Sequence, residues 1–159
     1  DLDSDPGEQK NVAAQHPDIV ARLKGEYEAW FKDVSATRGG YPPVRITLGA
    51  ARENPVTLTR QDWRGPKASW DPTGLGYWEV NVEGRGKYSA LARFHPTRES
   101  TELELRYGSL VRKQMVVAGT GEVRFDDLAL PLGPGRLELI LRSRSGERGV
   151  NYVDVRWSE

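Results

Sequence analysis

The sequence predicts a mainly β fold, an antiparallel β-sandwich preceded by one amphipathic helix. Short strand-like runs follow one another at near-regular spacing, and 17 Gly and 10 Pro among 159 residues make the chain rich in turns. Helical periodicity is found in one segment near the start. The length suits one domain with an appendage, and a hydrophobic content of 37% is enough for a core.

The charge and the missing cysteines exclude several classes of protein. There are 23 basic and 23 acidic residues, so the net charge is zero and the pI is about 7.0. General nucleic-acid and membrane-surface binders need an excess of basic charge, so neither partner is expected. The absence of Cys excludes disulfides, thiolate zinc sites and a cysteine nucleophile. No apolar run is long enough for a membrane span.

Residues 1–34 differ from the rest in charge and in periodicity. They carry 4 basic and 8 acidic side chains. Pro17 suits the first position of a helix, and Asp18 complements the positive end of the helix dipole. The following apolar residues recur on one helical face: Ile19, Val20, Leu23, Tyr27, Trp30, Phe31 and Val34. This face needs a partner, either the following domain or a preceding one that is missing.

Residues 1–34 also resemble a known family. The DPGEQKNVA string of residues 5–13 and the helix with Pro17 and Trp30 are similar to the C-terminal end of formylglycine-dependent arylsulfatases, where a DPxExxN-[LV]-A string precedes a terminal amphipathic helix. The resemblance implies that residues 1–34 end the catalytic region of a parent enzyme that hydrolyses sulfate esters with the help of calcium. It also implies an exported protein, periplasmic or secreted.

The catalytic signature of that family is missing from this chain. Formylglycine forms from the Cys or Ser of a C/S-x-P-x-R string, and neither form occurs here. The two histidines, His16 and His95, lie far apart, and no nucleophile elbow is present. We therefore expect a chain without catalytic residues or a cofactor of its own, whose partner is a missing upstream sulfatase domain that holds the calcium.

Residues 35–43, rich in Gly and Pro, predict a linker, and residues 44–159 predict the sandwich domain. Residues alternate between apolar and polar in several runs, as expected for strands with one buried face. The predicted strands are 44–48, 56–59, 77–82, 88–94, 101–107, 113–117, 123–130, 137–141 and 152–157.

The sandwich resembles the galactose-binding-like jelly roll, especially carbohydrate-binding modules of the family 6 and 35 type. Residues 76–94 match their W-x-V-x-V…G-x-Y-x-L-x-x-R hairpin, 130–139 a second hairpin, and 149–155 the closing G-x-N-x-D-x-[IV] strand. The resemblance implies that Asn151 hydrogen-bonds a sugar hydroxyl; the alternative is that Asn151 caps the loop before the last strand. A Trp that often precedes this Asn as a sugar platform is absent, since residues 119–123 read GTGEV.

Trp70 and two arginines are the other candidate ligand contacts. Trp70 lies in a loop-like segment, where an aromatic ring either stacks on a ligand or plugs the end of the sandwich; the same holds for Trp63. Arg144 and Arg148 precede Asn151, and a guanidinium binds sulfate or carboxylate at two points. Ordinary strand-edge solubility is the alternative for both arginines.

The remaining candidates are a core pair and a calcium site. Trp78 and Trp157 occupy strand positions and are expected in the core. Calcium ligands could come from residues 53–54 and 126–127, although no EF-hand spacing is present.

These observations predict a non-catalytic C-terminal part of an arylsulfatase whose sandwich recruits a sulfated glycan. The alternative is a purely structural domain that packs on the catalytic domain and stabilises it.

Overall fold

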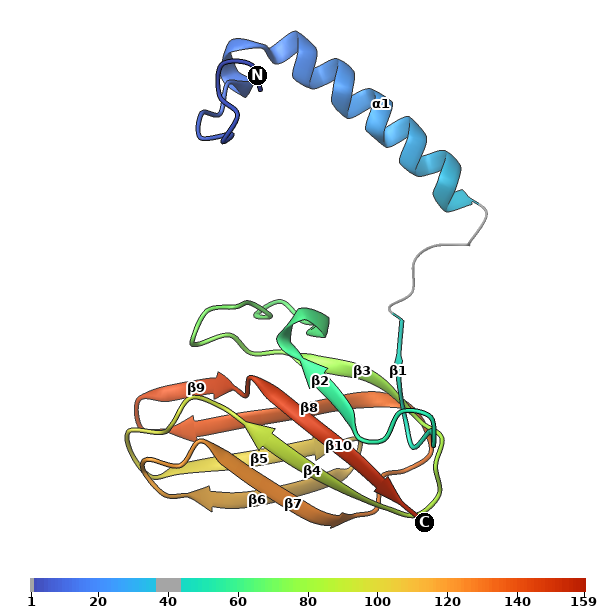
Figure 1. Ribbon diagram of the computed structural model, residues 1–159, viewed down its shortest axis with the longest axis vertical. Coiled ribbons are helices and arrows are strands. Elements are labelled where there is room, and N and C mark those ends of the chain that lie inside the picture. Colours follow the sequence, from blue (N-terminus) through green and yellow to red (C-terminus); the bar gives the residue numbers. More distant parts are fainter. Residues whose placement is uncertain (1, 37–43) are drawn as a thin grey trace. The chain divides into compact units, whose positions relative to one another are not determined.

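The computed structural model describes residues 2–36 and 44–159, which belong to two compact units, Asp1–Pro42 and Pro43–Glu159 (Figure 1). The first unit contains a short 3-10 helix, η1 (Ala13–Gln15), and one long helix, α1 (Pro17–Ala36). The second unit is a β-sandwich, so the predicted fold class is confirmed. None of the helices in the described part of the chain is both long and apolar enough to span a membrane.

Helix α1 begins at Pro17, as predicted, and continues two residues past the expected end at residue 34. Asp18 lies in its first turn, where a negative charge stabilises the helix dipole. Two ion pairs stabilise its polar side, and the partners in each are four residues, about one turn, apart: Arg22 with Glu26, and Lys24 with Glu28. The first two residues of the predicted linker are thus helical, and its remainder, 37–43, lies outside the described residues.

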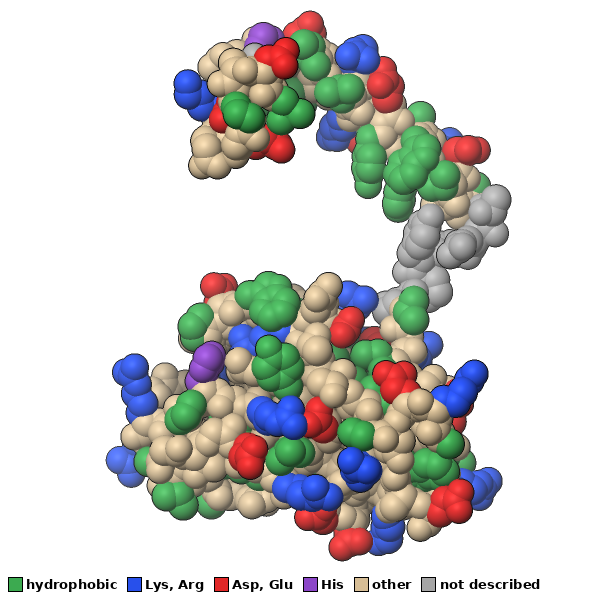
Figure 2. Space-filling view, in the orientation of Figure 1, with side chains coloured by type: hydrophobic (Ala, Val, Ile, Leu, Met, Phe, Trp, Pro, Cys, Tyr) green, Lys and Arg blue, Asp and Glu red, His purple; other side chains and the backbone are tan. Residues whose placement is uncertain are grey.

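The apolar stripe of α1 is exposed, and no residue of the helix is buried (Figure 2). Large side chains along it expose between 42% and 59% of their surface. The ring of Tyr27 lies 5.9 Å from that of Trp30 and 6.0 Å from that of Phe31. These rings therefore contact one another along one side of the helix.

The sandwich has two sheets, which together contain all nine predicted strands and one that was not predicted. The six-stranded sheet has the order β1-β3-β8-β5-β6, with β9 on β8, and the four-stranded sheet has the order β2-β10-β4-β7. The strands are β1 (Ile46–Leu48), β2 (Val56–Thr59), β3 (Tyr77–Val82), β4 (Lys87–Arg93), β5 (Thr101–Tyr107), β6 (Leu110–Val116), β7 (Glu122–Leu128), β8 (Gly133–Ser143), β9 (Gly146–Gly149) and β10 (Tyr152–Ser158).

One strand pair departs from the expected antiparallel pattern. β1 pairs with β3 in parallel, with Ile46 opposite Val80. The chain leaves the first sheet after β1, forms β2 in the other sheet and returns as β3, and such a crossover permits parallel neighbours. The remaining strand pairs are antiparallel.

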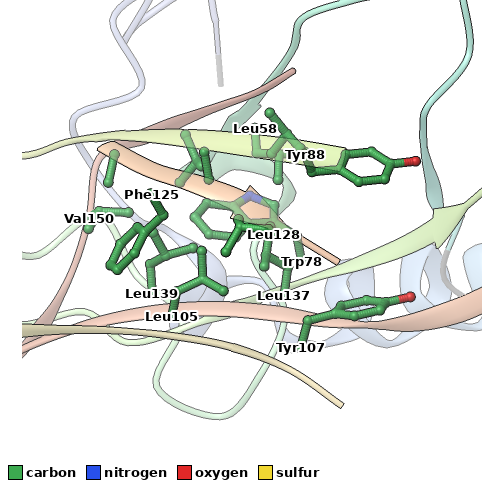
Figure 3. Close-up of a cluster of buried hydrophobic side chains, with 14 of the residues drawn as sticks. Leu58, Trp78, Tyr88, Leu105, Tyr107, Phe125, Leu128, Leu137, Leu139 and Val150 are labelled. Atoms are coloured by element: carbon green, nitrogen blue, oxygen red, sulfur yellow. The ribbon is translucent and has the colours of Figure 1, made fainter. Parts of the chain in front are cut away.

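The core lies between the two sheets and is centred on aromatic and aliphatic side chains (Figure 3). Burial alternates strictly along β3, so Trp78, Val80 and Val82 point inward. Trp78 is fully buried, as predicted, and its Nε1–H donates to the carbonyl of Thr59 at 2.7 Å. Trp157 is only partly buried and packs against the edge of the core.

A buried carboxylate lies on the outer face of the six-stranded sheet. The side chain of Glu104 is 1% exposed and forms ion pairs with Arg106, Lys113 (3.2 Å) and Arg142 (2.9 Å). Burial by itself raises the pKa of Glu104, but hydrogen bonds from the three cations outweigh it and lower the pKa to about 2. The long basic side chains therefore hold an ionised carboxylate beneath them.

Candidate functional site

Two adjacent hollows are lined by the segment between β2 and β3 and by the loop between β4 and β5. Residues at the start of β10 complete the first hollow, and the hairpin of β8 and β9 completes the second. The first hollow has a volume of about 190 Å³ and is lined by Arg60, Trp70, Pro72, His95, Asn151 and Tyr152. The second hollow has a volume of about 510 Å³ and shares Pro72 and His95 with the first.

Asn151 lines the first hollow and carries a buried hydrogen-bond acceptor without a partner among the described residues. Its backbone N–H donates to the carbonyl of Arg93 at 2.8 Å, which fixes the residue just before β10. Its Nδ2 lies 3.4 Å from Nε2 of His95. Its Oδ1 is buried and has no partner among the described residues. Because an unpaired buried acceptor is costly, a hydroxyl or amine of a ligand placed there would be stabilised.

Two exposed aromatic rings border the same hollow. Trp70 is 70% exposed and Tyr152 is 45% exposed, so both offer surface to a ligand. Tyr152 points outward because Val153 and Val155, its neighbours in the alternating pattern of β10, fill the core. These rings supply the flat apolar surface that the absent platform Trp, sought at residues 119–123, would have offered to a sugar.

Arg60 holds together the two segments that carry Trp70 and Asn151. It lies in a short 3-10 helix, η2 (Arg60–Asp62), that follows β2, and it is 8% exposed. Its guanidinium donates to three backbone carbonyls, those of Asp71 (2.8 Å), Gly149 (3.1 Å) and Val150 (3.1 Å). Each accepting carbonyl is within two residues of Trp70 or Asn151, so Arg60 is a positioning residue for the site.

Trp63 forms the floor beneath Arg60. The guanidinium carbon of Arg60 lies 4.6 Å from the centre of the Trp63 ring, and Trp63 is buried against Trp78 at 5.7 Å. A Cβ on Gly149 would come within 2.4 Å of this ring, and one on Gly76 within 2.6 Å. The two glycines therefore let the indole pack directly on the backbone. Trp63 therefore plugs the end of the sandwich rather than stacking on a ligand.

Arg60 lines the first hollow and Arg148 lines the second. Neither Arg60 nor Arg148 forms an ion pair with an acidic side chain among residues 2–36 and 44–159. Burial lowers the pKa of Arg60, and the charge of Arg148 lowers it further. Arg148 donates to the carbonyl of His95 at 2.6 Å, and burial lowers its pKa as well. An arginine stays protonated, so both guanidinium groups keep their charge in spite of burial.

The structure brings Asn151 and Trp70 together in the first hollow and places Arg148 in the second. Arg144 lies in the turn between β8 and β9 and is not among the residues that line either hollow. Sequence reasoning missed Arg60 and Tyr152. Strand alternation could have indicated that Tyr152 points outward, whereas nothing in the sequence distinguishes Arg60 from the other 16 arginines.

Two of the residues considered for calcium, Asn54 and Asp126, bind other parts of the chain. The Asn54 side chain donates to the carbonyl of Trp157 at 2.8 Å and accepts from its N–H at 2.9 Å. Asp126 accepts a hydrogen bond from Arg124 at 2.6 Å. Within the described part of the chain, no three His, Asp or Glu side chains are grouped so as to hold a metal ion.

Comparison of the chain with known protein families and with curated proteins finds no match in either. Among solved structures, the chain is similar to the Podospora anserina GH26-CBM35 β-(1,4)-mannanase, with a TM-score of 0.47 and 12% identity over 68% of this chain and 28% of that one. It is also similar to a ruminal GH26 endo-β-1,4-mannanase, with a TM-score of 0.45 and 15% identity over 66% of this chain and 26% of that one.

This chain thus spans little more than a quarter of either mannanase chain. At such low identity, the likeness concerns the course of the backbone and carries no residue of the site across. No comparison supports the predicted sulfatase resemblance of residues 1–34, which stays a prediction.

Proposed function

We propose that the sandwich is a non-catalytic module that binds a glycan in the first hollow. The observation that supports this most strongly is the buried, unpartnered Oδ1 of Asn151 beside the exposed rings of Trp70 and Tyr152. A sugar offers hydroxyl groups to such an acceptor and an apolar C–H face to such rings. In the first hollow, this acceptor and these two rings together match the hydroxyl groups and the apolar face of a sugar.

The charge of the site favours a sulfated glycan over a neutral one. Arg60 and Arg148 are partly buried, lie close enough to affect one another, and are without acidic partners in the described residues. A sulfate ester near them would neutralise charge that is already desolvated, which makes the attraction stronger than at an exposed arginine.

The module would serve a parent enzyme that hydrolyses sulfate esters. In this proposal residues 1–34 end the catalytic domain, which lies upstream and holds the calcium. A second candidate function is a purely structural one, in which the sandwich stabilises that domain. The exposed stripe of α1, with Tyr27, Trp30 and Phe31 on one side, supports the presence of such a neighbouring domain.

Affinity electrophoresis tests the binding proposal with the full chain. The gels contain κ-carrageenan, chemically desulfated κ-carrageenan or the neutral polysaccharide β-mannan. We expect κ-carrageenan to retard the protein most strongly and added salt to weaken the effect, because sulfate contacts are screened. Asn151→Ala and Trp70→Ala should abolish the retardation. Asn81→Ala, on the outer face of β3, and Trp30→Ala, on α1, serve as matched controls and should migrate like wild type.

If only the two uncharged polysaccharides retard the protein, the chain is a glycan-binding module but sulfate is not part of its target. If no gel retards the protein, the binding proposal is wrong and the structural function is favoured.

A further inference from the structure

The second hollow adjoins the first and differs from it in charge and size. The first hollow is smaller than ordinary ligand sites, which measure about 300–1,000 Å³, and the second, at about 510 Å³, falls within that range. Pro72 and His95 line both, so the two hollows are direct neighbours.

The charged side chains of the second hollow balance one another. Arg98 and Arg148 line it together with Glu99 and Glu147, whereas Arg60 is the one Asp, Glu, Lys or Arg that lines the first. An anionic group is therefore favoured in the first hollow. In the second hollow a second anion would face the two carboxylates.

Glu99 is a hydrogen-bond acceptor in the second hollow, and Ser145 holds its carboxylate in place. Its Oε1 accepts from Oγ of Ser145 at 2.8 Å and from the backbone N–H of Ser145 at 3.2 Å. Hydrogen bonds from Ser145 and Ser143 lower the pKa of Glu99, and the charge of Arg144 adds to them, so the carboxylate stays ionised. Glu99 lines the hollow and is not buried, so a ligand can reach its carboxylate.

Five residues with hydroxyl groups line the same hollow. Thr73, Thr97, Thr101, Ser143 and Ser145 line the hollow, with Leu141 and Pro96 as apolar surface. A combination of hydroxyls, a carboxylate, guanidinium donors and small apolar patches suits an uncharged polyhydroxy ring.

We propose that the two hollows form one groove for a glycan of at least two units, with a sulfated unit in the first hollow and an uncharged unit in the second. The inference rests on the proposed function of the first hollow and adds to it the length and the charge order of the ligand. Glu99 accepts hydrogen bonds from hydroxyls of the uncharged unit and disfavours sulfate there.

Titration calorimetry of the full chain with oligosaccharides of defined sulfation tests the groove. The probes are galactose 4-sulfate, κ-neocarratetraose, in which sulfated and uncharged units alternate, and ι-neocarratetraose, in which every unit is sulfated. We expect κ-neocarratetraose to bind about tenfold more tightly than galactose 4-sulfate, because the second unit adds hydrogen bonds to charged groups. The ι probe should bind more weakly than the κ probe.

Glu99→Gln keeps the shape of the side chain and removes its charge. It should abolish most of the gain from κ-neocarratetraose and the preference for κ over ι, and leave the affinity for galactose 4-sulfate unchanged. Glu122→Gln, an exposed position on β7, is the matched control and should behave like wild type.

Equal affinity for galactose 4-sulfate and κ-neocarratetraose would reject the second subsite and leave the first intact. If Glu99→Gln still binds κ-neocarratetraose more tightly than galactose 4-sulfate, the role of Glu99 and the proposed order of sulfated and uncharged units are wrong. Failure of the proposed function gives a different result: Asn151→Ala then binds all three probes as wild type does, or no probe binds.

Discussion

The helical unit and the sandwich are stabilised in different ways. α1 is 20 residues long, has no buried residue, and depends on its own backbone hydrogen bonds, two exposed ion pairs and contacts among Tyr27, Trp30 and Phe31. The buried hydrophobic side chains lie in the sandwich. In proteins, a helix gains most of its stability from packing of its amphipathic face, whereas a closed core supports a cooperative fold. We therefore expect the core to stabilise the sandwich cooperatively, and α1 to gain stability when its apolar stripe is covered.

The largest expected effect is that of emptying the sandwich core. Trp78→Ala removes a fully buried indole and its hydrogen bond to Thr59, and should lower the free energy of unfolding by about 3–5 kcal/mol. Trp30→Ala on α1 should leave the sandwich transition unchanged, because Trp30 is exposed. Urea denaturation followed by circular dichroism measures both. Equal destabilisation by the two variants would contradict the separation of the units.

A smaller effect is expected from the buried carboxylate of the sandwich. Glu104→Gln leaves three cations around a neutral amide and should cost about 1–3 kcal/mol. Glu26→Gln on α1 breaks only an exposed pair, and should cost at most about 0.5 kcal/mol. Urea denaturation at neutral pH compares the two variants.

The same carboxylate predicts a pH dependence. The pKa of Glu104 is about 2 in the folded chain, below its ordinary value of 4.5, so ionised Glu104 stabilises the fold above about pH 4.5. That contribution is lost as the pH falls from 4.5 towards 2. Urea midpoints of wild type and Glu104→Gln should therefore converge on acidification. Parallel curves over this range would show that Glu104 is not held ionised.

Arg60→Lys should have a moderate effect that is confined to the site. A lysine retains the charge but cannot donate to three carbonyls in one plane, so stability should fall by about 1 kcal/mol. Amide NMR shifts should change at residues 70–72 and 149–151. Shifts spread evenly over both sheets would contradict its role as a positioning residue.

The smallest effect is expected from removing the helical unit. A chain of residues 44–159 keeps every strand and the whole core, so its unfolding free energy should match that of the full chain within about 0.5 kcal/mol. Differential scanning calorimetry of the two chains measures this. A large drop in the melting temperature would show that the helical unit stabilises the sandwich.

Much of the fold could be predicted because the alternation of apolar and polar residues indicates the strands, and Gly and Pro indicate the turns between them. The strand at 146–149, which pairs with residues 140–143 of β8, was missed because Gly-Glu-Arg-Gly has no apolar residue. The parallel pairing of β1 was also missed, because the path of the chain between sheets leaves no local pattern.

The site was only partly predictable from the sequence. Asn151 and Trp70 are 81 positions apart, and the three carbonyl contacts of Arg60 that bring their segments together exist only in the folded chain. The choice of Arg144 followed from its position in an arginine-rich loop. The hairpin of β8 and β9 instead presents Arg148 to the second hollow and leaves Arg144 in the turn.

The central claim is that a glycan occupies the first hollow, and NMR titration of the ¹⁵N-labelled chain with κ-neocarratetraose tests it most directly. We expect saturable shifts of the Trp70 indole N–H and the Asn151 side-chain amide, with little change at the Trp30 indole on α1. If neither of the first two signals moves while the probe binds elsewhere, or if no signal moves at all, the hollow is not the glycan site.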